Sequence, residues 1–202
     1  MNDTRLLNWR LVVPDDGHPL LLLPADGEVM SGATVLERDP RSLRAALQPG
    51  AFHGVVASDL SSWQHVDGKG AAGLLERLAS VPPPGGWLYA AFPNPLVRPR
   101  RGGLGVRKAL RVVRAAGLEG AAGYVLLPSQ RRPAWLVPVR RRAELDVFLR
   151  RMVFPYAPLS SPVGAWFAAR ALVAARFLAL ILPHRLRVRF APAYAVVARR
   201  PA

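Results

Sequence analysis

Short apolar runs alternate with stretches of helical periodicity along the first two thirds of the chain. The runs are apolar on both faces and are bounded by Gly, Pro or Asp, which is typical of buried strands in a parallel sheet. They predict strands at residues 20–23, 33–37, 52–58, 86–92 and 123–127. Between them, apolar residues at helical spacing predict helices at residues 71–80 and 106–116. Strands that alternate with helices predict an open α/β sheet with right-handed crossovers.

The pattern changes in the last third of the chain. Residues 142–154 predict an amphipathic helix, and residues 163–182 are apolar on nearly every face. Arg170 and Arg176 oppose a transmembrane span, because each arginine costs about 2.5–3.5 kcal/mol near the centre of a bilayer. A helix pair packed in the core is the favoured interpretation, and an interfacial helix on a membrane or a lipid-like substrate is the alternative. A last strand is predicted at residues 193–198.

Composition limits the chemistry available to the chain. Its 202 residues suit one domain, and a hydrophobic content of 51% is ample for a packed core. Because the sequence has no cysteine, it has no disulfide, no thiolate zinc ligand and no cysteine nucleophile. His18, His53 and His184 have no partner at metal-ligand spacing, so no metal site is expected. The absence of cysteine and of an apolar leader agrees with a cytoplasmic location, and association with a membrane surface stays open.

The net charge of +15 is distributed unevenly. Residues 1–97 hold seven of the 28 basic residues and ten of the 13 acidic ones, a net charge of −3, which leaves +18 for the remainder. This asymmetry favours an anionic partner for the second half: nucleic acid, a phospholipid surface or a phosphorylated substrate. Only Lys69 and Lys108 are lysines, and a GC-rich genome produces the same arginine bias without a functional demand.

Four segments, taken in order, resemble a class I S-adenosylmethionine-dependent methyltransferase. They are a strand ending in an acid at 52–60 (FHGVVASDL), a Pro-Gly-Gly turn and strand at 84–90 (PGGWLYA), a helix-end turn at 115–119 (AAGLE) and a closing strand at 194–201 (YAVVARRP). The resemblance implies a Rossmann-like α/β fold, an open, mostly parallel sheet with helices on both faces and a helical insertion before the last strand. It implies a single methyltransferase-like domain over 1–202, with a core at 1–127, a mainly helical insertion at 128–192 and a closing strand and tail at 193–202.

The same resemblance implies that S-adenosylmethionine binds at the ends of the first two strands. The family's cofactor loop is a Gly-rich turn that opens a helix, and Asp26 and Gly27 stand at that place. Only nine residues, 24–32, separate the first two predicted strands, whereas a crossover with its helix needs at least ~10–12. The first helix is therefore expected to be absent or reduced to one turn. Glu37 stands where the family places the acid that binds the ribose hydroxyls, and Asp59 borders the cofactor or the substrate.

Each candidate residue also has a purely structural interpretation. Glu37 could be a solvated loop acid, Asp59 could cap the turn that follows it, and Asp26 with Gly27 could form an ordinary β-turn. His65, just after the strand at 52–58, is the candidate general base, and Asp59 is the second candidate catalytic residue. A lone histidine in a loop more often has no catalytic role.

Three functions follow from these observations. The first is methyl transfer from S-adenosylmethionine to a small or lipid-linked acceptor held by residues 128–192. The second is a degenerate methyltransferase-like protein that no longer binds the cofactor and serves as a binding or scaffold partner of another protein. The third, an RNA-associated protein, is favoured less, because the tryptophans stand in apolar runs rather than among the basic residues. The basic residues concerned, which could equally form a solvated helix face, are Arg98, Arg100, Arg101, Arg107, Lys108, Arg111 and Arg114.

Overall fold

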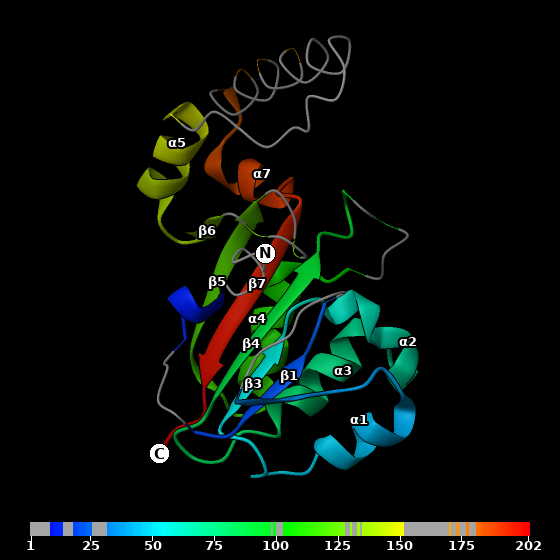
Figure 1. The fold of residues 1–202 in the computed structure, drawn as a ribbon. Helices are drawn as coiled ribbons and strands as arrows, with labels where there is room; N and C mark the ends of the chain where they lie inside the picture. The colour runs from blue at the N-terminus through cyan, green and yellow to red at the C-terminus, as the bar shows by residue number, and fades with distance from the viewer. Residues whose placement is uncertain are drawn as a thin grey trace.

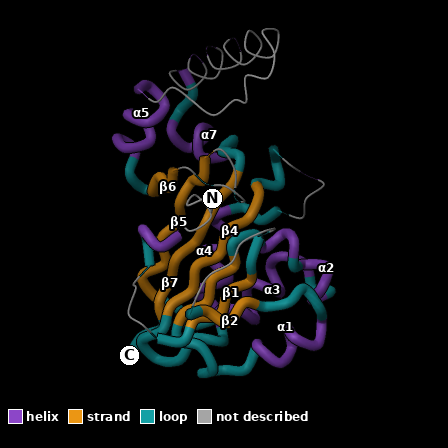
Figure 2. Tube along the Cα trace, viewed as in Figure 1, coloured by secondary structure: helices purple, strands orange, loops and turns teal. Residues whose placement is uncertain are grey.

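The computed structural model describes residues 9–13, 18–25, 32–97, 99, 103–127, 130, 133, 135–151, 170, 173, 177 and 181–202. The strands run through the middle of this structure, with helices beside and beyond them (Figure 1, Figure 2). The strands are β1 (Leu20–Leu23), β2 (Ala33–Val35), β3 (Gly54–Ala57), β4 (Trp87–Pro93), β5 (Glu119–Leu127), β6 (Trp135–Pro138) and β7 (Ala193–Arg199). The helices are α1 (Pro40–Ala46), the 3-10 helix η2 (Leu60–Ser62), α2 (Gln64–Asp67), α3 (Gly70–Ala79), α4 (Val106–Ala115), α5 (Arg142–Arg151) and α7 (His184–Arg189).

All seven strands form one sheet in the order β2-β1-β3-β4-β7-β5-β6. β1 is parallel to both of its neighbours, β2 and β3, and β3 is parallel to β4. β7 runs antiparallel between β4 and β5, so β5 points in the same direction as β4, while β6 at the edge is again reversed. The predicted open, mostly parallel Rossmann-like sheet is therefore confirmed, with the closing strand inserted between β4 and β5.

Each face of the sheet has its own cluster of buried side chains, because successive residues of a strand point to opposite sides. The buried residues of α1, α3, α4, α5 and α7 all belong to the larger cluster, together with strand residues such as Leu21 and Val55. In the smaller cluster, Trp9 and the partly buried Val12 pack with strand residues such as Leu22. Among the described residues, the buried side chains of these α-helices lie on one face, and the 3-10 turn at residues 9–11 contributes Trp9 to the other face.

The direction of the strand connections explains this asymmetry. From β1 to β2 the chain steps one way along the sheet, and from β2 to β3, β3 to β4 and β4 to β5 it steps the other way. Right-handed crossovers in opposite directions place their helices on opposite faces, so α1, α3 and α4 share a face. Only the link from β1 to β2 would supply a helix to the other face. That link has nine residues, 24–32, fewer than the ~10–12 that a crossover with a helix needs.

The apolar runs predict β1 at its observed bounds and place the other core strands within a few residues. The largest difference among them is β5, which begins at Glu119 rather than at residue 123. The short helix α1 is not predicted, because its seven residues offer little periodicity. It is set by its cap: the Asp39 carboxylate accepts hydrogen bonds from the backbone N–H groups of Arg41 (2.8 Å) and Ser42 (3.0 Å), and Pro40 stands in the first turn.

The predicted insertion at residues 128–192 contains a strand as well as helices. β6, a strand that the sequence pattern does not predict, pairs antiparallel with β5 at the edge of the sheet. Pro138, which has no N–H to donate, is tolerated in β6 because an edge strand has one unpaired side. α5 matches the helix predicted at residues 142–154, whereas α7 at residues 184–189 is not among the predicted helices; both lie beyond the end of the sheet to which β4 and β5 point (Figure 1).

Most of the apolar segment at residues 163–182 lies outside the described residues. Of the described ones, Val173, Phe177 and Ile181 are exposed, and their spacing places them on one side of a helix. In the described part of the chain, no helix combines the length and the apolar character needed to cross a membrane.

Candidate functional site

β1 and β3 end side by side. Their carboxyl ends lie at the end of the sheet where the resemblance places the cofactor. Asp59 stands two residues after β3 and is fully buried. Its carboxylate accepts hydrogen bonds from the backbone N–H of Ser61 (3.2 Å) and from the Ser61 hydroxyl (2.6 Å). Asp59 is thus the N-cap of η2, the structural role that competes with a place in a catalytic site.

A buried tryptophan covers the end of β1. The Trp63 side chain is 0% exposed, and its indole N–H donates a hydrogen bond to the carbonyl oxygen of Pro24 at 3.1 Å. Pro24 is the first residue after β1. The guanidinium of Arg38 lies 5.7 Å from the centroid of the Trp63 ring and 3.5 Å from the same carbonyl oxygen. Side chains that follow β2 and β3 therefore meet over the first residue of the predicted cofactor loop.

The other candidate residues lie apart from one another. Glu37, two residues after β2, is exposed. His65 is exposed on α2, where the side-chain amide of Gln64 donates to its Nε2 at 3.3 Å. Asp26 and Gly27 lie outside the described residues. Among the residues that the structure describes, no group of three or more His, Asp or Glu side chains could hold a metal ion.

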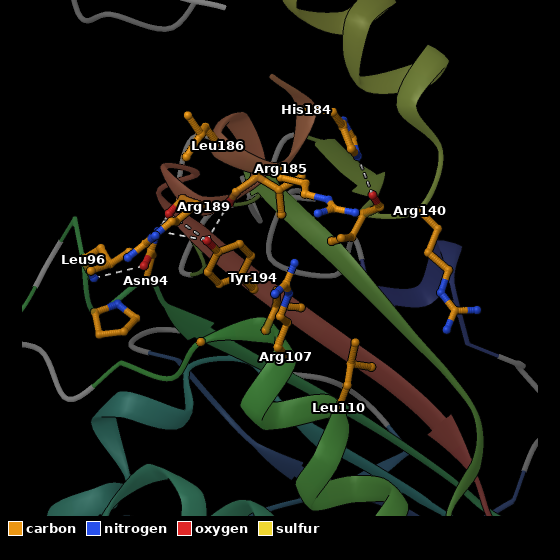
Figure 3. A pocket seen from close by; sticks show the side chains of 15 residues that line it. Asn94, Leu96, Arg107, Leu110, Arg140, His184, Arg185, Leu186, Arg189 and Tyr194 are labelled. Carbon is orange, nitrogen blue, oxygen red and sulfur yellow. Dashed lines mark hydrogen bonds between the residues drawn. The ribbon is translucent and has the colours of Figure 1, made fainter. Parts of the chain in front are cut away.

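A cavity of about 700 Å³ lies at the same end of the sheet, beyond the last residue of β4 and the first residue of β7 (Figure 3). This volume is in the range of small-molecule pockets, roughly 300–1,000 Å³. Its apolar lining comprises Leu96, Val106, Leu110, Val139, Leu186 and Val188, and its basic lining comprises Arg107, Arg140, His184, Arg185 and Arg189. None of the described lining residues is acidic, and none of the candidates Glu37, Asp59 and His65 is among them.

Buried polar contacts fasten α7 to the sheet beneath the cavity (Figure 3). Asn94, the residue after β4, is 1% exposed, and its Nδ2 donates to the carbonyl oxygens of Arg189 (2.7 Å) and Ala191 (2.6 Å). The Tyr194 hydroxyl donates to the carbonyl oxygen of Val188 at 2.6 Å and accepts from Asn94 Nδ2 at 3.0 Å. These contacts satisfy carbonyl groups at the C-terminal end of α7, where a helix has no internal donors left.

The other end and the outer side of α7 are held as well. His184 Nε2–H donates to the carbonyl oxygen of Val139 at 3.0 Å, while its buried Nδ1 has no hydrogen-bond partner among the described residues. Arg187 pairs with Asp146 of α5 and donates to the carbonyl oxygen of Leu182 at 2.6 Å. The wall that α7 contributes to the cavity is therefore fixed by the sheet, by the turn after β6 and by α5.

Burial raises the pKa of the Tyr194 hydroxyl to about 12, above its ordinary value of 10.0. Because the folded protein holds this proton more tightly than the unfolded chain does, the stabilisation is complete below pH ~10 and is lost as the pH rises through ~12. We expect the free energy of unfolding to fall by at most about 2 kcal/mol from this group between those pH values. Urea unfolding of the wild type and Tyr194→Phe at both pH values measures the difference. An equal loss in the two proteins would contradict this assignment.

The sequence pattern does not single out Asn94, Tyr194 or the arginines of α7. One local signal exists: Asn94 stands between Pro93 and Pro95, directly after a strand that is buried throughout. Its partners Arg189 and Tyr194 are 95 and 100 residues away along the chain, so no local spacing could have indicated the contact. Arg107 is the described member of the predicted basic set that reaches the cavity.

No protein-family model matches the sequence, and no curated protein matches it significantly. Three solved structures are similar in fold. A SAM-dependent methyltransferase from Archaeoglobus fulgidus is 13% identical with a TM-score of 0.41, over 83% of this chain and 67% of that chain. A structure from Galdieria sulphuraria, described as a putative sarcosine dimethylglycine methyltransferase, is 12% identical with a TM-score of 0.39, over 84% of this chain and 60% of that chain. The [4+2]-cyclase SpnF is 17% identical with a TM-score of 0.33, over 84% of this chain and 56% of that chain. The chain has an α/β Rossmann-like fold with a seven-stranded sheet.

Proposed function

We propose that this methyltransferase-like protein acts as a binding or scaffold protein and does not transfer a methyl group. One observation carries the proposal: the buried indole of Trp63 is hydrogen-bonded to the Pro24 carbonyl at the start of the cofactor loop. The cavity beyond β4 supports a binding role, because it is of ligand size and none of the candidate catalytic residues lines it.

The described residues do not fit S-adenosylmethionine. The backbone after the first strand has to approach the methionine portion closely, and here Trp63 and Arg38 both lie against the Pro24 carbonyl oxygen. The carboxylate of Asp59 is engaged by Ser61, which leaves Glu37 as the exposed acid for the ribose hydroxyls. The nine-residue link supplies too few residues for the helix that the family's loop opens.

Calorimetric titration with S-adenosylmethionine and with its demethylated product tests the proposal. We expect no binding heat for either compound up to about 1 mM, the concentration at which binding is worth only about 4 kcal/mol. Glu37→Ala is the matched variant, because this exposed side chain can be removed without disturbing the core. Micromolar binding by the wild type that Glu37→Ala weakens would overturn the proposal and favour methyl transfer to a small or lipid-linked acceptor.

A further inference from the structure

We infer that the cavity beyond β4 binds an amphipathic anion, a small molecule with one anionic group and one apolar portion. The inference rests on the proposed function, since it names the class of ligand that such a binding protein would hold. Arg107 comes from the first turn of α4, Arg140 from the turn after β6, and Arg185 and Arg189 from α7. Three elements far apart in the sequence therefore bring basic side chains to one concave surface (Figure 3).

Three arginines just outside the cavity lie beside acids. Arg141 pairs with Glu144 at 2.7 Å, and both Arg142 and Arg187 pair with Asp146. The cavity has no such compensation, because its described lining contains no carboxylate. Basic groups gathered around a low-dielectric wall raise the local positive potential and concentrate anions. An anionic group bound there would offset the mutual repulsion of the guanidinium groups and could accept their hydrogen bonds.

The helix at the floor of the cavity adds to this potential. α4 begins at the cavity, and its N-cap, Gly105, has no side chain to bond the free N–H groups of the first turn. A helix N-terminus carries roughly half a positive charge and favours anions. Here it reinforces the arginines that line the same space.

The apolar lining requires a ligand with more than an anionic group. Leu96 is 57% exposed, and Leu110 and Leu186 lie on two other elements that line the same cavity. An inorganic anion would leave these side chains in contact with water, whereas an apolar chain would cover them. The combination of basic and apolar lining thus distinguishes the site from a solvated basic helix face, which is only basic.

Titration with octyl phosphate, inorganic phosphate and 1-octanol, each below the concentration at which it self-associates, tests the inference. We expect octyl phosphate to bind at least ~10-fold more tightly than either part alone, because each part satisfies only one half of the lining. Leu96→Ser should weaken octyl phosphate and leave inorganic phosphate unchanged. Arg107→Gln combined with Arg189→Gln should weaken octyl phosphate at least ~10-fold.

Arg111→Gln is the matched control, because this exposed arginine lies on the same helix as Arg107 and does not line the cavity. Weakening by Arg111→Gln equal to that of the variant carrying both Arg107→Gln and Arg189→Gln would overturn the inference in favour of a diffuse basic surface. Binding of inorganic phosphate as tight as that of octyl phosphate would overturn it in favour of a simple anion site. If neither octyl phosphate nor S-adenosylmethionine binds, the amphipathic anion is refuted as the ligand of the cavity. The proposed function would still stand.

Discussion

Replacing Trp63 by alanine is expected to lower the free energy of unfolding by about 3–5 kcal/mol. The side chain is fully buried in the larger cluster, so its removal loses apolar burial and leaves a cavity. The substitution also removes the indole N–H that bonds the Pro24 carbonyl oxygen and the ring over which Arg38 lies. The loss should exceed that of a typical core leucine, because packing and a long-range hydrogen bond disappear together.

Urea unfolding followed by far-ultraviolet circular dichroism measures this effect. Trp135→Ala is the matched control, because Trp135 lies on the edge strand β6 and is only partly buried. The control should cost less than half as much. A loss below about 1 kcal/mol for Trp63→Ala would mean that Trp63 does not hold the end of β1, and would remove the main support for the proposed function.

Replacing Asn94 by leucine is expected to lower the free energy of unfolding by about 3 kcal/mol or more. The carbonyl oxygen of Ala191 would lose the Asn94 donor, that of Arg189 would keep only the longer contact from the Tyr194 hydroxyl (3.2 Å), and each buried acceptor left unsatisfied costs roughly 1–3 kcal/mol. Leucine branches at the same carbon but is the larger residue, so overpacking at this buried site adds to the loss of the hydrogen bonds. The C-terminal end of α7 would then be held to the sheet mainly by Tyr194, and octyl phosphate binding should weaken with it.

Asn94→Asp gives the sharper test of the same contact. The two side chains have the same shape, but an aspartate presents an oxygen instead of Nδ2 to the carbonyl oxygens of Arg189 and Ala191. We expect it to destabilise the protein as much as the leucine variant does, in urea unfolding near neutral pH. A stable Asn94→Asp protein would contradict the hydrogen-bond assignment at the base of α7.

The core strands and helices can be predicted from the sequence because each is marked by a pattern of residues within its own segment. Each buried strand is a continuous apolar run, and the amphipathic pattern of α4 separates its buried Val106, Ala109 and Val113 from exposed bases. The count of nine residues between β1 and β2 also predicts that this link is too short for a crossover helix, a prediction that falls mainly on residues 26–31, outside the described residues. The consequence, that the described helices of the core share one face, needs the order of the strands, which no local pattern contains.

The site could be predicted only in part, for the same reason. Asp59 and Glu37 stand at the ends of β3 and β2, as the sequence indicates, but whether a carboxylate binds a ligand or caps a turn depends on neighbours such as Ser61. The hydrogen bond of Trp63 to Pro24 spans 39 residues and has no signature in either segment. The charge distribution was more informative, because every basic residue lining the cavity belongs to the half of the chain that carries +18.

A two-dimensional 1H–15N spectrum of one labelled sample, titrated first with S-adenosylmethionine and then with octyl phosphate, tests the central claim most directly. The account predicts that S-adenosylmethionine leaves the amide signals of Leu36, Glu37 and Ser58 unchanged at the ends of the first strands. Octyl phosphate should then shift the signals of Leu96 and Arg107 at the cavity. Saturable shifts of Glu37 and Ser58 on addition of S-adenosylmethionine would contradict the account and establish an occupied cofactor site at β1.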